Sequence, residues 1–540
     1  MDSDTPSRFA RRSALRLIGA GGLALGGGMG GGLRAVLAQG QAPALVTPDK
    51  ARPQMPYGVM SGDVTGNRAV VWSRADRSAR MVVDLSTTQG MGDARRIIGP
   101  AALESSDFTA HLDVGDLAPG QTYFYRVQFQ DLADPKIYSV PLIGRFRTPP
   151  IKARDLVFAF SGDEAGQGWG INEAWGGYRV YESMRKFNPD FFIHSGDQIY
   201  ADGPLQPEVR LDDGSVWKNL VTPAKSKVAE TLDEFRGNFA YNLLDENKRR
   251  FCAEVPMLVQ WDDHEIRNNW FPDQQFGPQD TRYQERSASL LAARANRAMF
   301  EYNAMRPDPV DPERVYRAFR MGPLADVFML DERSYRGPNT ANRQGAGDRN
   351  ADFLGPGQTR WLKQSLLASR ATWKVIASDM PLSIVVRDLN ADVPKGTFEA
   401  WANADDGPPS GRELEVADLL GFIKQHNINN VVWVTADVHY ASATHYRPDN
   451  ARFTNFKPFW EFVGGPLNAG TFGPGEIDRT FGPEVKFVGL PPGMKQNRPP
   501  SDGLQFFGIG RIDARSRSLT VSLHGGDGQT LFEVELPAMS

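Results

Sequence analysis

The segment PDFFIHSGDQIY, residues 189–200, places a carboxylate and a phenol three residues apart. Its apolar run at 191–194 predicts a buried strand, and the Ser-Gly pair that follows predicts a turn at the carboxyl end of that strand. Ligands of open α/β sheets collect at this end of the strands. The side chains of Asp197 and Tyr200 could therefore converge on one bound group.

Acidic residues also follow five other apolar runs in the chain after residue 150. They are Asp163, the pair Asp262 and Asp263, Asp331, Asp379 and Asp437. A single acid after a strand is a helix N-cap or a turn residue about as often as it is a ligand. Six such strand ends in one segment instead predict a carboxylate-rich rim along one edge of a sheet. Clustered carboxylates without counter-charge destabilise a fold, so multivalent cations are the natural occupants of this rim.

The supply of side chains limits which cations the rim can hold. The single cysteine, Cys252, excludes a thiolate site and lies among apolar neighbours, as a small core residue would. Seven histidines are present, and four of them lie near the predicted rim: His194, His264, His439 and His445. These histidines are too few to favour a zinc site made mainly of imidazole ligands. Carboxylate oxygens suit hard cations such as calcium, magnesium, manganese or ferric iron.

The rest of the chain must provide the elements that position these residues. Between residues 50 and 150, short β runs separated by turn residues show no helical period, which predicts a β-sandwich of the fibronectin-III or immunoglobulin kind. From 151 to 540, apolar runs alternate with segments of helical period, which indicates an α/β (α+β) domain. The tail at 506–537 predicts two strands and a hairpin that complete a second sheet.

Three insertions interrupt the α/β pattern. Those at 202–222 and 386–411 each follow a rim carboxylate closely, so we interpret them as walls or lids of a cleft. The segment 338–352 has the composition of a flexible loop. Tolerated surface loops are the alternative interpretation, and for the third insertion the two are equally consistent with the sequence.

The N-terminus predicts export. Arg11 and Arg12 precede a weakly apolar, glycine-rich run, and small residues precede a cleavage position near residue 38, which is typical of a twin-arginine signal at 1–38. A basic tail with a flexible linker is the alternative. No later stretch is long and apolar enough to span a bilayer, so we expect a protein exported by the twin-arginine machinery to the periplasm or medium. A net charge of −4 over 540 residues suggests neither nucleic acid nor an anionic membrane as a partner.

The rim motifs together resemble those of the dinuclear metallophosphoesterases. The chain has GD at Asp163, GDxxY at Asp197 and Tyr200, DDHE at Asp263 and His264, SDMP at Asp379, and ADVH at Asp437 and His439. The GDxxY form is that of purple acid phosphatases, in which the tyrosine binds ferric iron. The resemblance implies a two-sheet α/β sandwich as the fold of the second domain.

Carried over residue by residue, the resemblance implies two metal positions. The first has Asp163, Asp197, Tyr200 and His439 as ligands. The second shares Asp197 as a bridge and adds Asp263, Asp437 and Asp379. Aspartates stand where the family has Asn or His at the second position, and this shifts it from zinc or ferrous iron toward calcium.

More closely, the chain is similar to the PhoD-like alkaline phosphatases and phosphodiesterases. The strings that carry this resemblance are GDQIYADG, WDDHE, LDERSYR, WLKQSLLASRATWKVIASDMP and TADVHY. It implies ferric iron and calcium as cofactors, and hydrolysis of a phosphate ester by a metal-bound hydroxide. Some members have a cysteine ligand where this chain has Gly162-Asp163, so zinc, manganese or magnesium stay open for the first metal.

Other roles in this mechanism have simpler alternatives. His264 is a candidate for protonating the leaving oxygen or binding phosphate, and otherwise a structural histidine. Asp262 competes with Asp263 for one role, and Tyr200 could be a buried tyrosine that caps a helix. Candidates for holding phosphoryl oxygens are Arg333, Arg336, Asn268 and Asn269, although surface arginines are common.

The predicted function is that of an exported phosphate-ester hydrolase, an alkaline phosphatase or phosphodiesterase, and we expect a monomer. Small-molecule and phospholipid phosphate esters both fit as substrates. A phospholipase D-like phosphodiesterase is the alternative among enzymes, with aromatic residues near the rim to line a pocket. A surface-binding β-sandwich protein with a degenerate metal domain is the alternative from another class. Six intact rim acids argue against it, because a dead site has no use for the charge.

Overall fold

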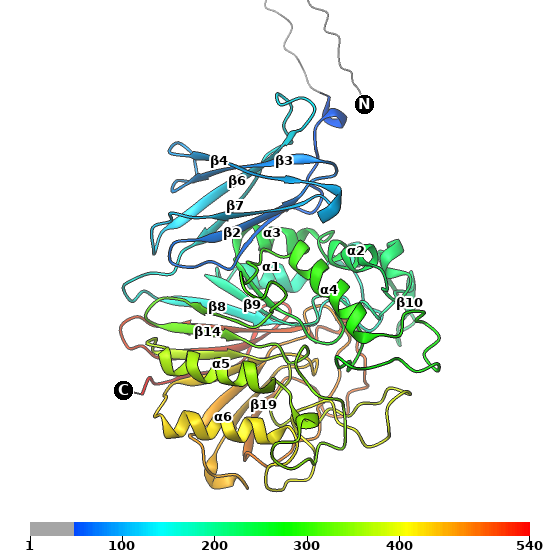
Figure 1. The fold of residues 1–540 in the computed structure, drawn as a ribbon, viewed down its shortest axis with the longest axis vertical. Helices are drawn as coiled ribbons and strands as arrows, with labels where there is room; N and C mark the ends of the chain where they lie inside the picture. The colour runs from blue at the N-terminus through cyan, green and yellow to red at the C-terminus, as the bar shows by residue number, and fades with distance from the viewer. Residues whose placement is uncertain (1–47, 540) are drawn as a thin grey trace, which may run out of the picture. The chain divides into compact units, whose positions relative to one another are not determined.

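The computed structural model describes residues 48–539, so the predicted signal at 1–38 lies outside the described part. The described chain has an N-terminal β-sandwich and a larger region of two sheets with helices on their outer faces (Figure 1). None of the helices in this part is long and apolar enough to cross a membrane.

The sandwich consists of two layers that enclose one apolar core. One layer has β1 (Val59–Gly62), β2 (Ala69–Arg74) and β5 (Thr109–Val114). The other has β4 (Arg95–Ala102), β3 (Ala79–Ser86), β6 (Thr122–Asp131) and β7 (Leu142–Arg147). Alternation explains the strands: in β6, Tyr123, Tyr125, Val127 and Phe129 are buried while the residues between them are partly exposed.

The sandwich is joined to the next region by a close backbone approach. Gly62 of β1 pairs with Met257, which continues the layer of β1 into the sheet beyond. A Cβ at Gly62 would lie 2.5 Å from the carbonyl oxygen of Ala304, so only glycine fits there. The Tyr125 hydroxyl donates to the carbonyl of Ala253 across the junction at 3.2 Å. The two regions are thus packed and hydrogen-bonded together.

The larger region contains two sheets that face one another. The first has, in order, β22 (Thr530–Leu536), β21 (Leu519–Gly525), β20 (Phe506–Ile512), β8 (Leu156–Ser161), β9 (Phe191–Ser195) and β12 (Met257–Gln260). The second has β13 (Arg317–Arg320), β14 (Ala325–Met329), β15 (Trp373–Ala377), β16 (Val431–Thr435), β18 (Phe459–Val463), β17 (Ser442–Tyr446) and β19 (Pro483–Val488). A separate hairpin has β10 (Glu208–Arg210) and β11 (Val216–Lys218).

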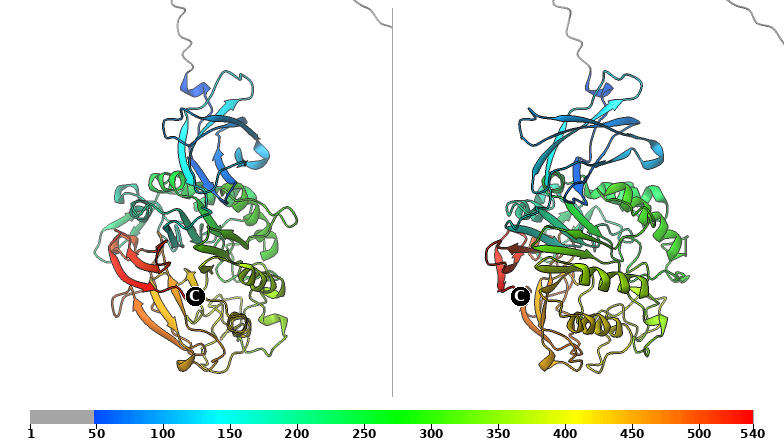
Figure 2. Two further views of the ribbon diagram at one scale, coloured as in Figure 1. Left: turned by 90° about the vertical axis from the view of Figure 1, so that its left-hand side faces the viewer. Right: turned by 60° about the vertical axis from the view of Figure 1, so that its left-hand side comes forward.

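Helices cover the outer faces of both sheets, which gives four layers (Figures 1 and 2). On the first sheet lie α1 (Arg179–Arg185), α2 (Leu232–Asn242), α3 (Glu246–Glu254) and α4 (Ala288–Tyr302). On the second lie α5 (Gly355–Ala368) and α6 (Glu413–Gln425). Between the sheets, apolar side chains such as Phe158, Phe160 and Val327 form a common core. Such burial, at about 25 cal/mol per Å² of apolar surface, is the main force that holds the layers together.

The predicted fold class, a β-sandwich followed by a two-sheet α/β sandwich, is confirmed. The six apolar runs form β8, β9, β12, β14, β15 and β16, three in each sheet, and the three in each sheet are parallel. The predicted single rim is therefore made by the carboxyl ends of two sheets. The tail forms β20–β22, but these strands extend the sheet of β8 and do not complete the second sheet.

Candidate metal centre

The residues after the strand ends have an unusual backbone conformation. Asp163, Asp197, Asp437 and His439 have φ angles of 66°, 50°, 62° and 62°. The left-handed backbone region is unfavourable for residues other than glycine. Residues that are held in it are concentrated at functional sites. A Cβ at Gly196 would lie 2.5 Å from Cβ of Asp262, so a glycine is required before Asp197. The turns therefore direct these side chains to one place at the cost of local strain.

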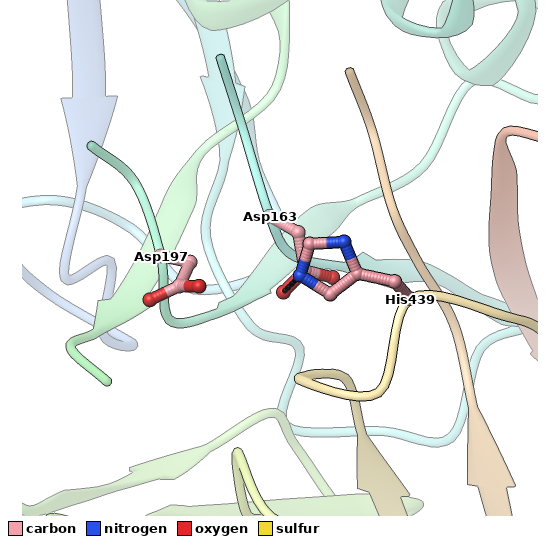
Figure 3. Close-up of side chains that lie close together, drawn as sticks. All are labelled: Asp163, Asp197 and His439. Atoms are coloured by element: carbon pink, nitrogen blue, oxygen red, sulfur yellow. Dashed lines mark ion pairs between the residues drawn. The ribbon is translucent and has the colours of Figure 1, made fainter. Parts of the chain in front are cut away.

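Three of these side chains form a compact group, which Figure 3 shows. One ligand atom each of Asp163, Asp197 and His439 lie within 4.8 Å of one another, and all three residues are buried. Nε2 of His439 lies 3.6 Å from Oδ1 of Asp163. The phenol oxygen of Tyr200 lies 2.9 Å from the same Nε2. All four predicted ligands of the first metal are thus brought together.

His439 is oriented by the backbone. Its Nδ1 lies 2.5 Å from the carbonyl oxygen of Gly470, a partner that can only accept, so Nδ1 carries the proton. Nε2, which faces Asp163 and Tyr200, is then the lone-pair nitrogen. Burial lowers the pKa of His439 to about 4, so the ring is neutral at neutral pH. A backbone acceptor on one nitrogen and a free second nitrogen is the usual arrangement of a metal-binding histidine.

The carboxylates of this site have unmet hydrogen-bonding capacity. Both carboxylate oxygens of Asp163 are buried without a hydrogen-bond partner, as are Oδ1 of Asp263 and Oδ2 of Asp379. Burial raises the pKa of Asp163 and of Asp197 well above the usual value for a carboxyl. Buried acceptors that no protein donor satisfies are costly, and a cation satisfies several of them at once. The residues therefore fit a metal site.

A second group shares one carboxylate with the first. Ligand atoms of Asp197, Asp263 and His264 lie within 4.8 Å of one another. The backbone N–H of His264 donates to Oδ1 of Asp197 at 3.1 Å, and that of Asn269 donates to Oδ2 of Asp263 at 2.6 Å. Asp197 belongs to both groups, which is the position that a bridging ligand requires.

The structure also places the other two carboxylates predicted for the second metal. Asp379, after β15, has Oδ2 3.7 Å from Nε of Arg333, while its Oδ1 accepts the N–H of Met380. Asp437, after β16, is partly exposed, and burial with nearby carboxylates raises its pKa. Asp262 instead accepts from Nε of Arg333 at 2.7 Å. Of the two neighbouring aspartates, Asp263 belongs to the second group and Asp262 does not.

Three comparisons relate the chain to known proteins. The profile of the family described as PhoD-like phosphatase matches residues 158–523, and that of its N-terminal domain matches residues 40–150. The chain belongs to the PhoD-like phosphatase family. It is 28% identical over 492 residues to alkaline phosphatase D of Bacillus subtilis, which covers 86% of this chain and 76% of that protein. Membership makes the chain a phosphoric ester hydrolase, as predicted.

Solved structures show the same fold. The chain superposes on a structure of PhoD with a TM-score of 0.65 at 21% identity, covering 92% of this chain and 94% of that one. It also matches a purple acid phosphatase from yellow lupin seeds, with a TM-score of 0.52 at 12% identity over 89% and 74% of the two chains. Relatives of these kinds imply metal cofactors. The metals themselves and the individual ligand residues stay predictions.

Two arginines of this PhoD-like phosphatase are buried beside the carboxylates of the site. Arg333 and Arg336 are 0% and 4% exposed. Nη1 of Arg333 lies 2.5 Å, and Nη1 of Arg336 2.7 Å, from Oε1 of Glu399. With its other nitrogens on Asp262, Arg333 lies among carboxylates and is enclosed by protein. These ion pairs favour charge balance within the site as the role of both arginines, and the predicted contact with phosphoryl oxygens stays a proposal.

Sequence reasoning missed the carboxylates that pair with the two arginines and with His264. Glu399 lies in the loop 386–411, and nothing in its local sequence marks it. Asp202 accepts from Nδ1 of His264 at 2.7 Å through one oxygen and from the N–H of Asn268 at 2.8 Å through the other. Burial lowers the pKa of His264, but the charges of Asp202 and Asp263 outweigh it and raise that pKa to about 9. Asp202 is two residues after Tyr200 in GDQIYADG, so this motif could have identified Asp202 as a residue of the site.

Asn269 is held by the loop 386–411. Its side-chain amide donates to Oδ1 of Asp388 at 3.2 Å, and Asn339 donates to Oδ2 of the same carboxylate at 2.8 Å. Asn269 is 6% exposed and has a φ of 61°. The side chain thus fastens the loop to the segment after β12, and its backbone N–H supports Asp263. The predicted contact with phosphate stays a proposal.

Proposed function

We propose that this PhoD-like phosphatase is an exported metal-dependent hydrolase of phosphomonoesters and phosphodiesters. The observation that carries the proposal is the group of Asp163, Asp197, Tyr200 and His439. It joins two buried, unpaired carboxylate oxygens to an imidazole lone pair and a phenol. Hydrogen bonds within the chain do not satisfy this set, and a cation would.

Asp163, Asp197, Tyr200 and His439 would hold the first metal, for which the phenol favours ferric iron. Asp197, Asp263, Asp437 and Asp379 would hold the second, and a site of carboxylate oxygens alone favours calcium. When bound, two such cations activate water as a nucleophile and offset the charge that develops on a phosphoryl group. The chain's own contribution is to fix the ligands and to balance the charge that remains.

His264 is the residue that we propose as proton donor to the leaving oxygen. Asp202 fixes its Nδ1, so Nε2 faces the site, 3.8 Å from Oδ1 of Asp263. The ring packs on Tyr200 with centroids 4.2 Å apart, which limits its tilt. Its side chain is 13% exposed, unlike the fully enclosed Arg333, so a substrate can reach it. Position and protonation both suit general acid catalysis.

The proposal includes the domain organisation and the destination of the protein. Residues 1–38 would be the twin-arginine signal, 50–150 the β-sandwich and 151–540 the catalytic domain. Export by this route carries folded proteins, which suits a metal site assembled before translocation. The periplasm or the medium would be the site of action.

One experiment on the purified protein tests the function. Its metal content is measured, and its rates are compared on a phosphomonoester and a phosphodiester, for the wild type and Asp197→Asn. Loss of the shared carboxylate should remove activity on both substrates by about 10³-fold or more, together with bound metal. Asp212→Asn, which alters an exposed ion pair with Lys495, is the control and should retain both. Full activity of the Asp197 variant would overturn the mechanism.

A further inference from the structure

A cavity lies at the end of the sheet opposite to the candidate metal centre. Its volume is about 800 Å³, within the range of ligand pockets of about 300–1,000 Å³. It is lined at the first residues of three parallel strands, Trp373 of β15, Val431 of β16 and Phe459 of β18. The predicted metal ligands follow the carboxyl ends of β15 and β16, so the cavity is separated from them by the length of these strands.

The walls of this cavity are apolar and aromatic. Trp373, Trp433 and Trp460 contribute rings, Ile423 of α6 lies on one side, and Leu536 lies on the other. Trp460 stacks on His445 with ring centroids 4.7 Å apart and an interplanar angle of 18°. Such walls fit an aliphatic or aromatic chain and offer it few hydrogen bonds.

The C-terminal wall is fixed in place. The side-chain amide of Asn430 donates to the carbonyl of Met539 at 2.9 Å, and the N–H of Met539 donates to the side-chain oxygen of Asn430 at 2.8 Å. This reciprocal pair holds the tail beside the start of β16. The C-terminal segment that lines the cavity is therefore held by hydrogen bonds to Asn430.

Lys457 is the one lysine or arginine among the described residues that line the cavity. Lys457 lines the cavity, and its Nζ donates to Oδ1 of Asn427 and of Asn429, each at 2.5 Å. Among the described residues that line the cavity there is no aspartate or glutamate. Burial alone lowers the pKa of Lys457, with no carboxylate raising it. The two amide oxygens accept from the ammonium and carry no negative charge of their own.

We propose that this cavity binds a single-chain anionic amphiphile, a medium- or long-chain carboxylate, with its head group on Lys457 and its chain among Trp373, Trp460 and Leu536. The charge of Lys457 selects an anion, because the ammonium would repel a cationic head group. The apolar walls select a chain, because a small anion would leave them exposed. The site is independent of the proposed phosphatase function and requires no metal.

Titration of the purified chain with octanoate, decanoate and dodecanoate below their micellar concentrations tests the proposal, by calorimetry and tryptophan fluorescence. Each added methylene that is buried should tighten the dissociation constant by about fourfold. Decyltrimethylammonium, with a decyl chain and the opposite charge, should bind at least tenfold more weakly than decanoate. Equal binding of the two, or no effect of chain length, would overturn the proposal.

Variants locate the site. Lys457→Met keeps an apolar stem and removes the charge, and should weaken decanoate binding about tenfold. Ala538→Trp adds a ring to the tail wall and should abolish binding, while the denaturation midpoint and the phosphatase rate stay at their wild-type values. Lys424→Met is the matched control, because this exposed lysine of α6 does not line the cavity. Unchanged decanoate binding in both Lys457→Met and Ala538→Trp would refute the assignment.

Discussion

Nε2 of His439 faces both the phenol oxygen of Tyr200, at 2.9 Å, and Oδ1 of Asp163, at 3.6 Å. Without a cation, the phenol donates a hydrogen bond to the imidazole lone pair. Burial raises the pKa of Tyr200 well above its usual value, so the phenolate forms only beside a strong Lewis acid. The same three atoms surround the position that we assign to the first metal.

Replacing Tyr200 with Phe therefore tests the identity of that metal. If ferric iron is bound by the phenolate, the wild type should absorb visible light, and the variant should lose this band, most of its iron and at least tenfold of kcat/KM. Absorption spectra and metal analysis of both proteins give the answer. Tyr283→Phe is the control, since Tyr283 is also buried and its hydroxyl donates to the carbonyl of Ile266 at 3.5 Å. An unchanged band in Tyr200→Phe would exclude an iron–phenolate bond.

The contact between Asp202 and His264 predicts a dependence on the leaving group. In Asp202→Asn, an amide oxygen can still accept from Nδ1 of His264, but the negative charge beside the ring is lost, so the pKa of His264 falls and less of the ring carries the proton to be donated. For Asp202→Asn we expect a loss of about 10²-fold on alkyl phosphates, whose leaving oxygens need a proton. On p-nitrophenyl phosphate, whose leaving group is stable as an anion, the loss should be under tenfold. Equal losses on both substrates would show that Asp202 has only a structural role.

A buried ion pair behind the metal centre predicts a large effect on stability. Nζ of Lys248 on α3 lies 2.6 Å from Oε2 of Glu164, and both side chains are enclosed. His194 lies 3.5 Å from the same oxygen, also buried. Removing one partner leaves a charge unpaired in the interior, which costs about 3–5 kcal/mol. Lys248→Met should therefore lower the free energy of unfolding by roughly this amount, measured by urea denaturation.

The control for this prediction lies on the same helix. Arg250 pairs with Glu246 at 2.7 Å on the exposed side of α3, and exposed pairs contribute about 0–1 kcal/mol. Arg250→Met should thus leave the midpoint almost unchanged. Adding Glu164→Gln to Lys248→Met should recover part of the loss, because it removes the unpaired charge. If Lys248→Met and Arg250→Met are equally stable, the buried pair of Lys248 and Glu164 does not contribute more to stability than an exposed pair does.

The convergence of Asp163, Asp197, Tyr200 and His439 was predictable because each of them follows the end of an apolar run. Asp197 and Tyr200 are three residues apart after a strand, and the apolar runs before Asp163 and Asp437 show where the other strands end. Parallel strands bring their carboxyl ends to one edge, so alternation of strands and helices was enough to predict that these residues meet. The two-sheet arrangement came from the family resemblance, since a fully buried strand reads alike in either sheet.

The partners of the charged residues were not predictable. Arg333 pairs with Glu399, which is 66 residues away in sequence in an irregular loop, and only the packing of that loop decides the contact. The local sequence LDERSYR does not show whether its arginines face solvent or a carboxylate. The tail likewise has a clear strand pattern, but the pattern does not say which sheet edge it joins. Long-range pairing of this kind depends on the whole fold.

A carboxyl group away from the metal centre predicts how stability changes with pH. Glu461 on β18 is 1% exposed, and its oxygens accept from the N–H of Leu382 at 2.8 Å and from the hydroxyl of Tyr446 at 2.7 Å. Burial raises the pKa of Glu461 to about 7 from a usual value of 4.5. The folded chain therefore binds this proton more tightly than the unfolded chain does. The resulting stabilisation is complete below pH 4.5 and is lost as the pH rises through 7.

Glu461→Gln should remove this dependence, because an amide stays neutral at every pH. Between pH 5 and pH 8 the wild type should lose up to about 3 kcal/mol more than the variant, following about 1.4 kcal/mol for each unit of pKa. Denaturation midpoints at pH 5, 6, 7 and 8 measure the difference. Glu484→Gln is the control, because Glu484 is only half-buried beside Lys486 on β19 and the substitution should leave the profile between pH 5 and pH 8 nearly unchanged. If the Glu461→Gln profile runs parallel to that of the wild type, Glu461 does not bind a proton on folding in this pH range.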